Sequence, residues 1–175
     1  SGERIKKKHG KHLIVSIKSL WSQNVKGLSY IVKAMKFVKQ KHPDWKYLVI
    51  GPGDPSELKE ITKKDDTQDV VVFVGSIPQE EKLEYWNATD IAPHSFAYEF
   101  STAISFLEFL AMGRCNLITD IGAVKEYVKD AAFLVKAYDP KSIADGINTL
   151  IENPKMRKEL GKKKKLEEAG ATVNL

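Results

Sequence analysis

The sequence predicts an α/β protein with an open, doubly wound, mostly parallel six-stranded sheet that has helices on both faces. Two observations carry this prediction. Short apolar segments of the kind found in buried strands alternate, about six times along the chain, with segments whose apolar residues recur at helical spacing. The connections between them are short and contain the glycine, proline and aspartate residues that are typical of turns.

Six segments are predicted to be strands, because each is a run of four to six mostly apolar or β-branched residues that ends at a turn signal. They are residues 12–17, 46–50, 70–74, 90–93, 115–119 and 132–135. Short apolar runs of this kind are typical of strands that are buried on both faces of a parallel sheet. Helices are expected between them, over residues 27–39, 56–63, 79–87, about 101–111, 123–128, from 140 onwards and again after 154.

Length and composition predict one soluble domain. A chain of 175 residues with 42% hydrophobic residues can bury one sizeable core, and it has no apolar run of the roughly 18 residues needed to span a membrane. We expect this domain over residues 12–168, after a linker or expression remnant over residues 1–11 and before a tail over residues 169–175. The one cysteine, Cys115, excludes an internal disulfide, and no signal peptide is visible, so a cytoplasmic location is expected.

The net charge of +5 does not predict a nucleic-acid-binding protein. Eight lysines lie near the ends of the chain, namely Lys6, Lys7, Lys8, Lys11 and Lys162 to Lys165. Without them the 28 basic residues fall to 20, against 23 acidic ones. Terminal basic runs are usually solvated tails or linker ends, although these would also suit contact with an anionic membrane surface.

Several common chemistries are excluded by spacing. Gly51-Pro52-Gly53 follows a strand, but Ser56 stands where a dinucleotide-binding fingerprint needs its third glycine. The chain has no Walker-type phosphate loop and no Asp-x-Asp pair, and His9 and His12 have no third metal ligand nearby in the sequence. We therefore expect no cofactor and no metal ion.

The candidate binding site is the segment over residues 93–113. It contains a predicted strand end, a loop with one carboxylate, Glu99, and a helix that starts near Ser101 and Thr102 and carries a second carboxylate, Glu108. The N–H groups and the dipole at a helix start favour an anion such as a diphosphate. A carboxylate can accept hydrogen bonds from the two hydroxyls of a ribose, although Glu108 at the edge of an amphipathic helix could also be simply solvated.

Cations are expected on the same rim as this segment. In parallel sheets ligands bind beyond the carboxyl ends of the strands, so the loops after Ile17, Ile50, Val74 and Pro93 should meet there. Lys18 follows the first strand, and Lys26 opens the first long helix. Phosphates are natural partners for both, although either lysine alone could be a solvated surface charge.

Nearly the whole chain, from about residue 12 to 165, resembles the C-terminal domain of retaining, group 1 (family 4) glycosyltransferases of the GT-B fold. The resemblance rests on the order and spacing of these pieces: Lys26-Gly27 before a helix, Val49 to Gly53, Val72 to Ile77, Asp90 to Pro93, Glu99 through Glu108, Ala111-Met112-Gly113 and Glu126-Tyr127-Val128. In that family the C-terminal domain binds a nucleotide-sugar donor, and a preceding N-terminal domain binds the acceptor. The resemblance thus implies that residues 12–168 form the Rossmann-like, nucleotide-sugar-binding half of such an enzyme.

The family's phosphate and ribose ligands can be placed on this sequence. Glu108 matches the second glutamate of the family's Glu-x7-Glu motif, which implies a ribose ligand. Lys26 matches the phosphate-binding lysine. Lys18 is the nearest stand-in for the arginine that partners it, although Lys18 stands eight residues before Lys26 rather than the usual five.

The resemblance also implies residues for the donor sugar and the base. Eight residues separate Glu99 from Glu108 instead of seven, so either Glu99 or Phe100 fills the first motif position, beside the donor sugar. The backbone N–H groups of Phe100, Ser101 and Thr102 would contact the sugar and the diphosphate. The loop that contacts the base is matched by Gly75, Ile77 and Gln79.

The implied reaction is the transfer of a sugar from a nucleotide diphosphate to an acceptor hydroxyl with retention of anomeric configuration. Lys18, Lys26 and Glu99 are the implied catalytic residues, and the two lysines and the helix start would stabilise the leaving diphosphate without a metal ion or cofactor. The implied partners are a nucleotide-sugar donor, an N-terminal acceptor domain and a glycan, lipid or small-molecule acceptor. Two alternatives remain, a non-catalytic flavodoxin-like interaction module and half of another GT-B enzyme, such as a nucleotide-sugar epimerase.

Overall fold

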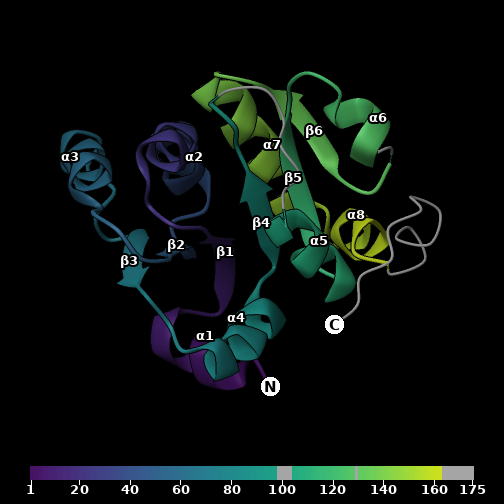
Figure 1. Cartoon of the computed structure of the whole chain (residues 1–175), viewed down its shortest axis with the longest axis horizontal. Helices are drawn as coiled ribbons and strands as arrows, with labels where there is room; N and C mark the ends of the chain where they lie inside the picture. The colour runs from purple at the N-terminus through teal and green to yellow at the C-terminus, as the bar shows by residue number, and fades with distance from the viewer. Residues whose placement is uncertain (98–103, 129, 163–175) are drawn as a thin grey trace.

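The protein folds around one six-stranded sheet in which all neighbouring strands are parallel, and this confirms the predicted fold class (Figure 1). The computed structural model describes residues 1–97, 104–128 and 130–162. The strand order is β3-β2-β1-β4-β5-β6. The strands are β1 His12–Ile17, β2 Trp45–Ile50, β3 Val71–Gly75, β4 Ile91–His94, β5 Cys115–Asp120 and β6 Phe133–Lys136.

Helices cover both faces of the sheet, because successive side chains of each strand are buried on opposite sides. In β1, Ile14 joins an apolar cluster with α2 (Ser22–Lys41), α3 (Ser56–Lys64), α7 (Pro140–Glu152) and α8 (Pro154–Leu160). Its neighbours Leu13 and Val15 face the other way. That second face is covered by α1 (Glu3–His9), α4 (Lys82–Ala88), α5 (Ile104–Ala111) and α6 (Val124–Val128).

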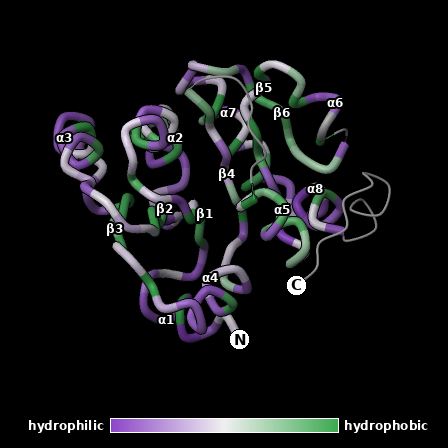
Figure 2. Tube along the Cα trace, viewed as in Figure 1, coloured by the Kyte–Doolittle hydropathy of each residue, from purple (hydrophilic) through white to green (hydrophobic). Residues whose placement is uncertain are grey.

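The hydropathy of the helices fits this layered arrangement. The traces of α2 and α7 alternate hydrophobic and hydrophilic stretches, as expected for one buried and one solvated side (Figure 2). A short 3-10 turn, Gln79–Glu81, precedes α4. At the start of α7 Asp139 caps the helix, since its carboxylate accepts a hydrogen bond from the Ser142 N–H at 3.1 Å.

The N-terminal segment differs from the linker predicted over residues 1–11. Residues 3–9 form α1, which lies beside α4 (Figure 1). Ile5 is fully buried, and Arg4 pairs with Glu84 at 2.9 Å. Lys6 donates to the Asp90 carboxylate at 2.9 Å. The lysine-rich helix α1 shows no apolar periodicity in the sequence. One buried isoleucine and two ion pairs nevertheless hold it against the rest of the domain.

The long helix α2 begins at Ser22, five residues earlier than predicted. Its first turn, Ser22 to Asn24, is polar and carries no hydrophobic signal, whereas Val25 is buried and already belongs to the apolar face. The earlier start brings the N-terminus of a 20-residue helix to the carboxyl edge of the sheet. The predicted helix start at Ser101 and Thr102 lies outside the described residues.

The strand order reverses between β1 and β4, and a buried hydrogen-bond chain joins the strands at this point. The Tyr47 hydroxyl donates to the Ser16 hydroxyl at 2.9 Å, and the Ser16 hydroxyl donates to the Pro93 carbonyl at 3.1 Å. These hydrogen bonds link the middle of β2 to the residues just before the carboxyl ends of β1 and β4. In open α/β sheets, the crevice above such a reversal is the usual ligand site.

Candidate functional site

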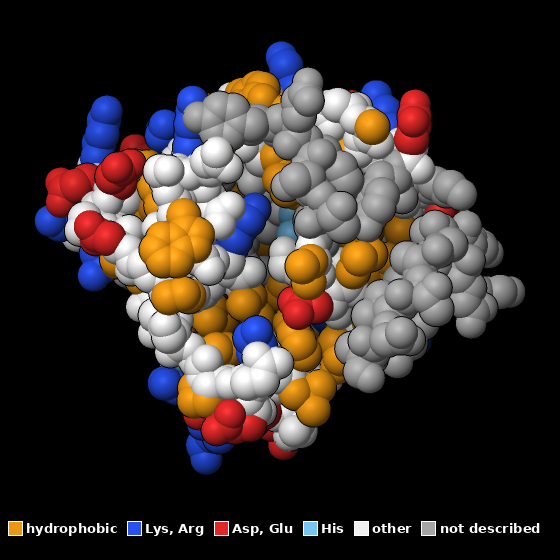
Figure 3. Space-filling view, in the orientation of Figure 1, with side chains coloured by type: hydrophobic (Ala, Val, Ile, Leu, Met, Phe, Trp, Pro, Cys, Tyr) orange, Lys and Arg blue, Asp and Glu red, His pale blue; other side chains and the backbone are white. Residues whose placement is uncertain are grey.

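A cavity of about 700 Å³ opens at the carboxyl edge of the sheet, above the point where the strand order reverses. Its walls come from the loops after β1, β2, β3 and β4 and from α5, which confirms that these four loops share one rim. Figure 3 shows a hollow near the middle of this face, where basic, acidic and hydrophobic side chains meet. The volume is within the range of small-molecule and cofactor sites.

Backbone contacts hold the rim loops together. The Lys18 N–H donates to the Ile50 carbonyl at 2.7 Å, and the Gly51 N–H donates to the Gly75 carbonyl at 2.9 Å. Gly51 has a φ of 148°, and a Cβ there would lie 2.1 Å from the Lys18 carbonyl oxygen. Only glycine allows this approach, so the sequence Gly51-Pro52 fixes the loop after β2 against the loop after β1.

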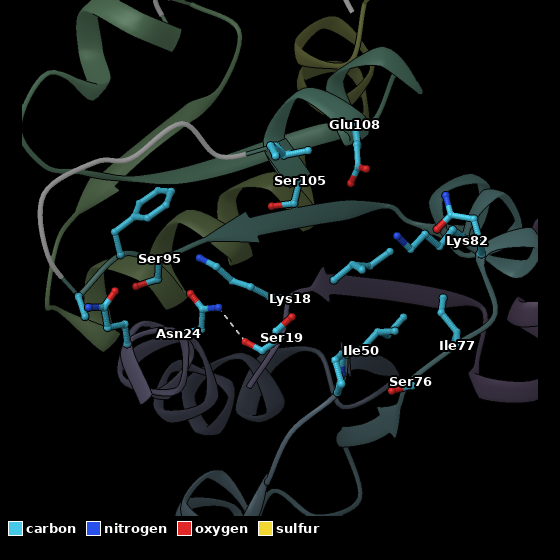
Figure 4. Close-up of a pocket in the computed structure, with 18 residues that line it drawn as sticks. Lys18, Ser19, Asn24, Ile50, Ser76, Ile77, Lys82, Ser95, Ser105 and Glu108 are labelled. Atoms are coloured by element: carbon cyan, nitrogen blue, oxygen red, sulfur yellow. Dashed lines mark hydrogen bonds between the residues drawn. The ribbon is translucent and has the colours of Figure 1, made fainter. Parts of the chain in front are cut away.

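The N-terminal turn of α2 forms one wall. Gln23 and Asn24 line the cavity, and the Asn24 side-chain amide donates to the Ser19 carbonyl at 2.8 Å (Figure 4). The helix approaches the loop after β4 very closely, because a Cβ on Gly27 would lie 2.4 Å from the Ser95 carbonyl oxygen. The positive end of a long helix dipole therefore lies beside the cavity.

Lys18 supplies a positive charge in the cavity. Its side chain is half-buried and points into the cavity from the end of β1 (Figure 4). Its ammonium lies 4.8 Å from the centroid of the Phe96 ring, and burial lowers its pKa. Among the residues that the structure describes, no carboxylate lies within ion-pair distance of it. A partly desolvated cation of this kind suits an anionic ligand.

Glu108 faces into the cavity from α5, on the opposite wall (Figure 4). Burial raises the pKa of its carboxyl, and the nearby positive charge of Lys82 opposes that rise. Lys82, the first residue of α4, also lines the cavity and is half-buried. Among the described lining residues, Glu108 thus has the Lys82 cation close to it, and the Lys18 cation lies on the other wall.

A neutral histidine lies below the cavity. His94 is buried at the end of β4, and burial lowers the pKa of its ring to about 4, with a smaller contribution from the Lys18 charge. Its Nε2 is 2.8 Å from Asn116 Oδ1. Because the Asn116 amide nitrogen donates to the Arg114 carbonyl at 3.1 Å, the amide oxygen faces His94, and we assign the proton of the neutral ring to Nε2.

The structure brings together four of the predicted site residues. Lys18, Ile77, Gln79 and Glu108 all line the cavity. Gly75 ends β3 with a φ of 80° and leads into the lining residue Ser76. Lys26 is exposed on α2 and is not among the lining residues. The remaining predicted residues, Glu99, Phe100, Ser101 and Thr102, lie outside the described part of the chain.

Other polar residues of the cavity were not predicted from the sequence: Ser19, Gln23, Asn24, Ser76, Lys82, Ser95 and Ser105. Asn24 lies two residues before Lys26, and Lys82 lies three residues after Gln79. The early start of α2 is what turns Asn24 toward the cavity. Extending the predicted helix toward the strand would have found it.

Neither a metal centre nor a membrane span is evident in the described residues. Over residues 1–97, 104–128 and 130–162, no three His, Cys, Asp or Glu side chains gather as a metal ion would require. No helix in the same ranges combines the length and apolar character that crossing a bilayer demands.

Comparisons with known proteins agree with this fold. The family model described as glycosyl transferases group 1 matches residues 2–167. An uncharacterized glycosyltransferase of Haemophilus influenzae is 26% identical over 157 residues, covering 87% of this chain and 43% of that protein. The chain thus spans less than half the length of that relative.

Solved structures show the same fold. The C-terminal domain of a group 1 family glycosyl transferase, LpcC, from Francisella tularensis superimposes with a TM-score of 0.81, covering 95% of this chain and 90% of that one at 24% identity. HepE from Anabaena, in complex with UDP and glucose, gives a TM-score of 0.82 at 16% identity, covering 97% of this chain and 47% of that one. These findings confirm the resemblance predicted from the sequence: the chain belongs to the group 1 glycosyl transferases.

Proposed function

We propose that this chain is the donor-binding domain of a retaining glycosyltransferase that moves a hexose-type sugar from a nucleotide diphosphate to an acceptor hydroxyl. One observation carries the proposal. Lys18 and Glu108 line one cavity at the strand-order reversal from two different elements, the first as a cation without a carboxylate partner among the described residues and the second as a half-buried carboxylate (Figure 4). A nucleoside diphosphate has an anionic end and a hydroxyl-bearing end that match this pair.

The proposed ligand lies along the cavity with its phosphates at Lys18 and the N-terminus of α2. Its ribose hydroxyls donate to Glu108, and its base contacts Ile77 and Gln79, in the loop that begins at Gly75. Gln23 and Asn24 offer additional polar groups beside the phosphates. Glu99, Phe100, Ser101 and Thr102 remain our proposed contacts to the sugar and the diphosphate.

The proposed reaction breaks the bond between the anomeric carbon and the diphosphate and forms a bond from that carbon to the acceptor oxygen on the same face of the sugar. The electron pair of the broken bond goes to the leaving diphosphate oxygen, and that oxygen takes up the proton that the acceptor hydroxyl loses. Lys18, which lines the cavity, stabilises the developing charge together with the helix dipole, and Lys26, exposed in the second turn of α2, is proposed to add its charge from outside the cavity lining. In this proposal they compensate the charge without a metal ion or cofactor.

A second domain completes the proposed enzyme. Because the chain spans 43% of the Haemophilus relative, we place the acceptor site on an N-terminal domain outside this chain. The isolated chain would then bind donor without transferring sugar. The acceptor would be a glycan, lipid or small molecule in glycan, glycolipid or polysaccharide synthesis, with the enzyme in the cytoplasm or at a membrane surface.

Calorimetric titration tests the proposal, with UDP and GDP as ligands and their nucleosides for comparison. UDP is included because the Anabaena neighbour of the same fold was solved with it. We expect at least one diphosphate to bind the wild-type chain and Glu108→Ala to weaken that binding at least tenfold. Glu57→Ala, at an exposed position of α3, should bind like wild type. If neither diphosphate binds wild type, or if Glu108→Ala binds as well as wild type, the assignment is wrong.

A further inference from the structure

We propose that Phe96 is a positioning residue, whose ring holds the Lys18 ammonium in the donor pocket while leaving its charge free for the ligand's phosphates. This inference rests on the proposed donor site. It concerns a residue that lines the cavity but carries no polar side chain.

The first support is the geometry of the pair. The Lys18 Nζ lies 4.8 Å from the centroid of the Phe96 ring, inside the distance at which the ring's negative face attracts a cation. The two residues follow β1 and β4, the strands on either side of the reversal in strand order. The contact therefore spans the crevice in which the ligand is proposed to lie.

The second support is that the ring is anchored. Phe96 is only 8% exposed. It packs in the apolar cluster of α5, α6 and β5, together with Phe106, Leu110 and Ile118. Its backbone N–H faces the Thr119 hydroxyl at 3.3 Å. A ring fixed in this way limits where a flexible lysine side chain can place its ammonium.

The third support is electrostatic. A carboxylate partner would also fix Lys18, but it would neutralise the charge that the phosphates need. An aromatic ring attracts the cation without carrying a net charge. Among the described residues Lys18 has the ring and no ion pair, which is the arrangement expected of a cation kept for an incoming anion.

The test compares Phe96→Leu with wild type in the binding of UDP and uridine, or of GDP and guanosine if GDP is the tighter ligand. We expect the diphosphate Kd to rise about fivefold, in keeping with a partly desolvated cation–π contact, and the nucleoside Kd to stay unchanged. Phe96→Tyr should restore wild-type affinity, because it keeps the ring. In a Lys18→Met background, Phe96→Leu should have no further effect.

Leu110→Ala controls for a loosened core, because Leu110 belongs to the same cluster but does not line the cavity. It should lower the thermal stability without changing the ratio of diphosphate to nucleoside affinity. A second measurement needs no ligand: the ε-methylene protons of Lys18 should show a ring-current shift in wild type that is lost in Phe96→Leu.

Three binding results would overturn the role of Phe96: an unchanged diphosphate Kd in Phe96→Leu, an equal loss of nucleoside affinity, or a full additional loss in the Lys18→Met background. A missing ring-current shift in wild type would also overturn it. Failure of the proposed donor site gives a different result, because wild type itself would then bind neither UDP nor GDP. In that case the proposed role of Phe96 would also be wrong, even if the ring-current shift were present.

Discussion

Gly27, in the first turns of α2, lies directly against the carbonyl oxygen of Ser95, the residue that follows β4: a Cβ on Gly27 would be 2.4 Å from that oxygen. The contact lets the positive end of α2 approach the loop that contributes Ser95, Phe96 and Ala97 to the cavity. Two walls of the candidate site therefore depend on the absence of one side chain.

Gly27→Ala should destabilise the protein, although replacing a glycine by alanine inside a helix normally stabilises by about 1 kcal/mol. Here the new methyl group meets backbone, which must move. The matched control is the pair of variants Lys33→Gly and Lys33→Ala, at an exposed position of the same helix. There the alanine variant should be more stable than the glycine variant. Urea unfolding measures the free energy of unfolding of each variant. If Gly27→Ala were more stable than wild type, the close approach of Gly27 to the Ser95 carbonyl oxygen would be contradicted.

Glu108→Gln should leave the unliganded protein at least as stable as wild type at pH 8. Burial raises the pKa of Glu108, so the folded state prefers the protonated carboxyl and ionisation at high pH costs stability. Glutamine keeps the shape without the charge. Melting temperatures of wild type and Glu108→Gln at pH 8 and pH 4.5 check this prediction. Any excess of the variant's melting temperature over that of wild type should be smaller at pH 4.5. A clear loss of stability at pH 8 would show that the ionised carboxylate is favoured in the fold.

His94 should make stability depend on pH in a defined window. Its pKa is about 4 in the folded protein, against 6.5 for an ordinary histidine. Between these values the unfolded chain binds a proton that the folded protein does not, so stability falls as the pH falls, by about 3 kcal/mol across the window. Urea unfolding from pH 7 to pH 4 should show a flatter slope in His94→Gln, and NMR should show no titration of the wild-type ring above pH 5. A ring that titrates near 6.5 would contradict its burial as a neutral side chain.

Ile5→Ala should destabilise the protein by about 2–4 kcal/mol, as expected for a buried side chain cut back in a packed core. Ile5 is fully buried by α4 and the sheet. Lys7→Ala, at an exposed position of the same short helix, should change stability by less than about 0.5 kcal/mol. Equal, small effects of both substitutions would mean that residues 3–9 are a linker, as the sequence predicts.

The sheet could be predicted from sequence because its strands are buried on both faces. Each predicted strand lies within one residue of the observed one at either end, from residues 12–17 in β1 to residues 133–136 in β6. Continuous apolar runs between turn residues carry this information locally. The helix α1 could not be found in the same way, since its stability comes from Ile5 and from pairs with residues about 80 positions away.

The candidate site was predictable only in part. Lys18 could be placed because it comes just after a predicted strand. Glu108 could be placed because it lies within the helix that follows another predicted strand. Asn24 and Lys82 depend on where α2 begins and how α4 is turned toward the cavity. The contact between Lys18 and Phe96 joins residues 78 positions apart, and a sequence pattern does not show which ring meets which ammonium.

The central claim is that a nucleotide diphosphate lies between Lys18 and Glu108, with its phosphates at the lysine. The most direct measurement is the ratio of nucleoside Kd to diphosphate Kd, in wild type and in Lys18→Met, at one fixed salt concentration. We expect wild type to bind the diphosphate at least tenfold more tightly than the nucleoside, and Lys18→Met to lose most of that difference while binding the nucleoside as before. An unchanged ratio in Lys18→Met would contradict the claim.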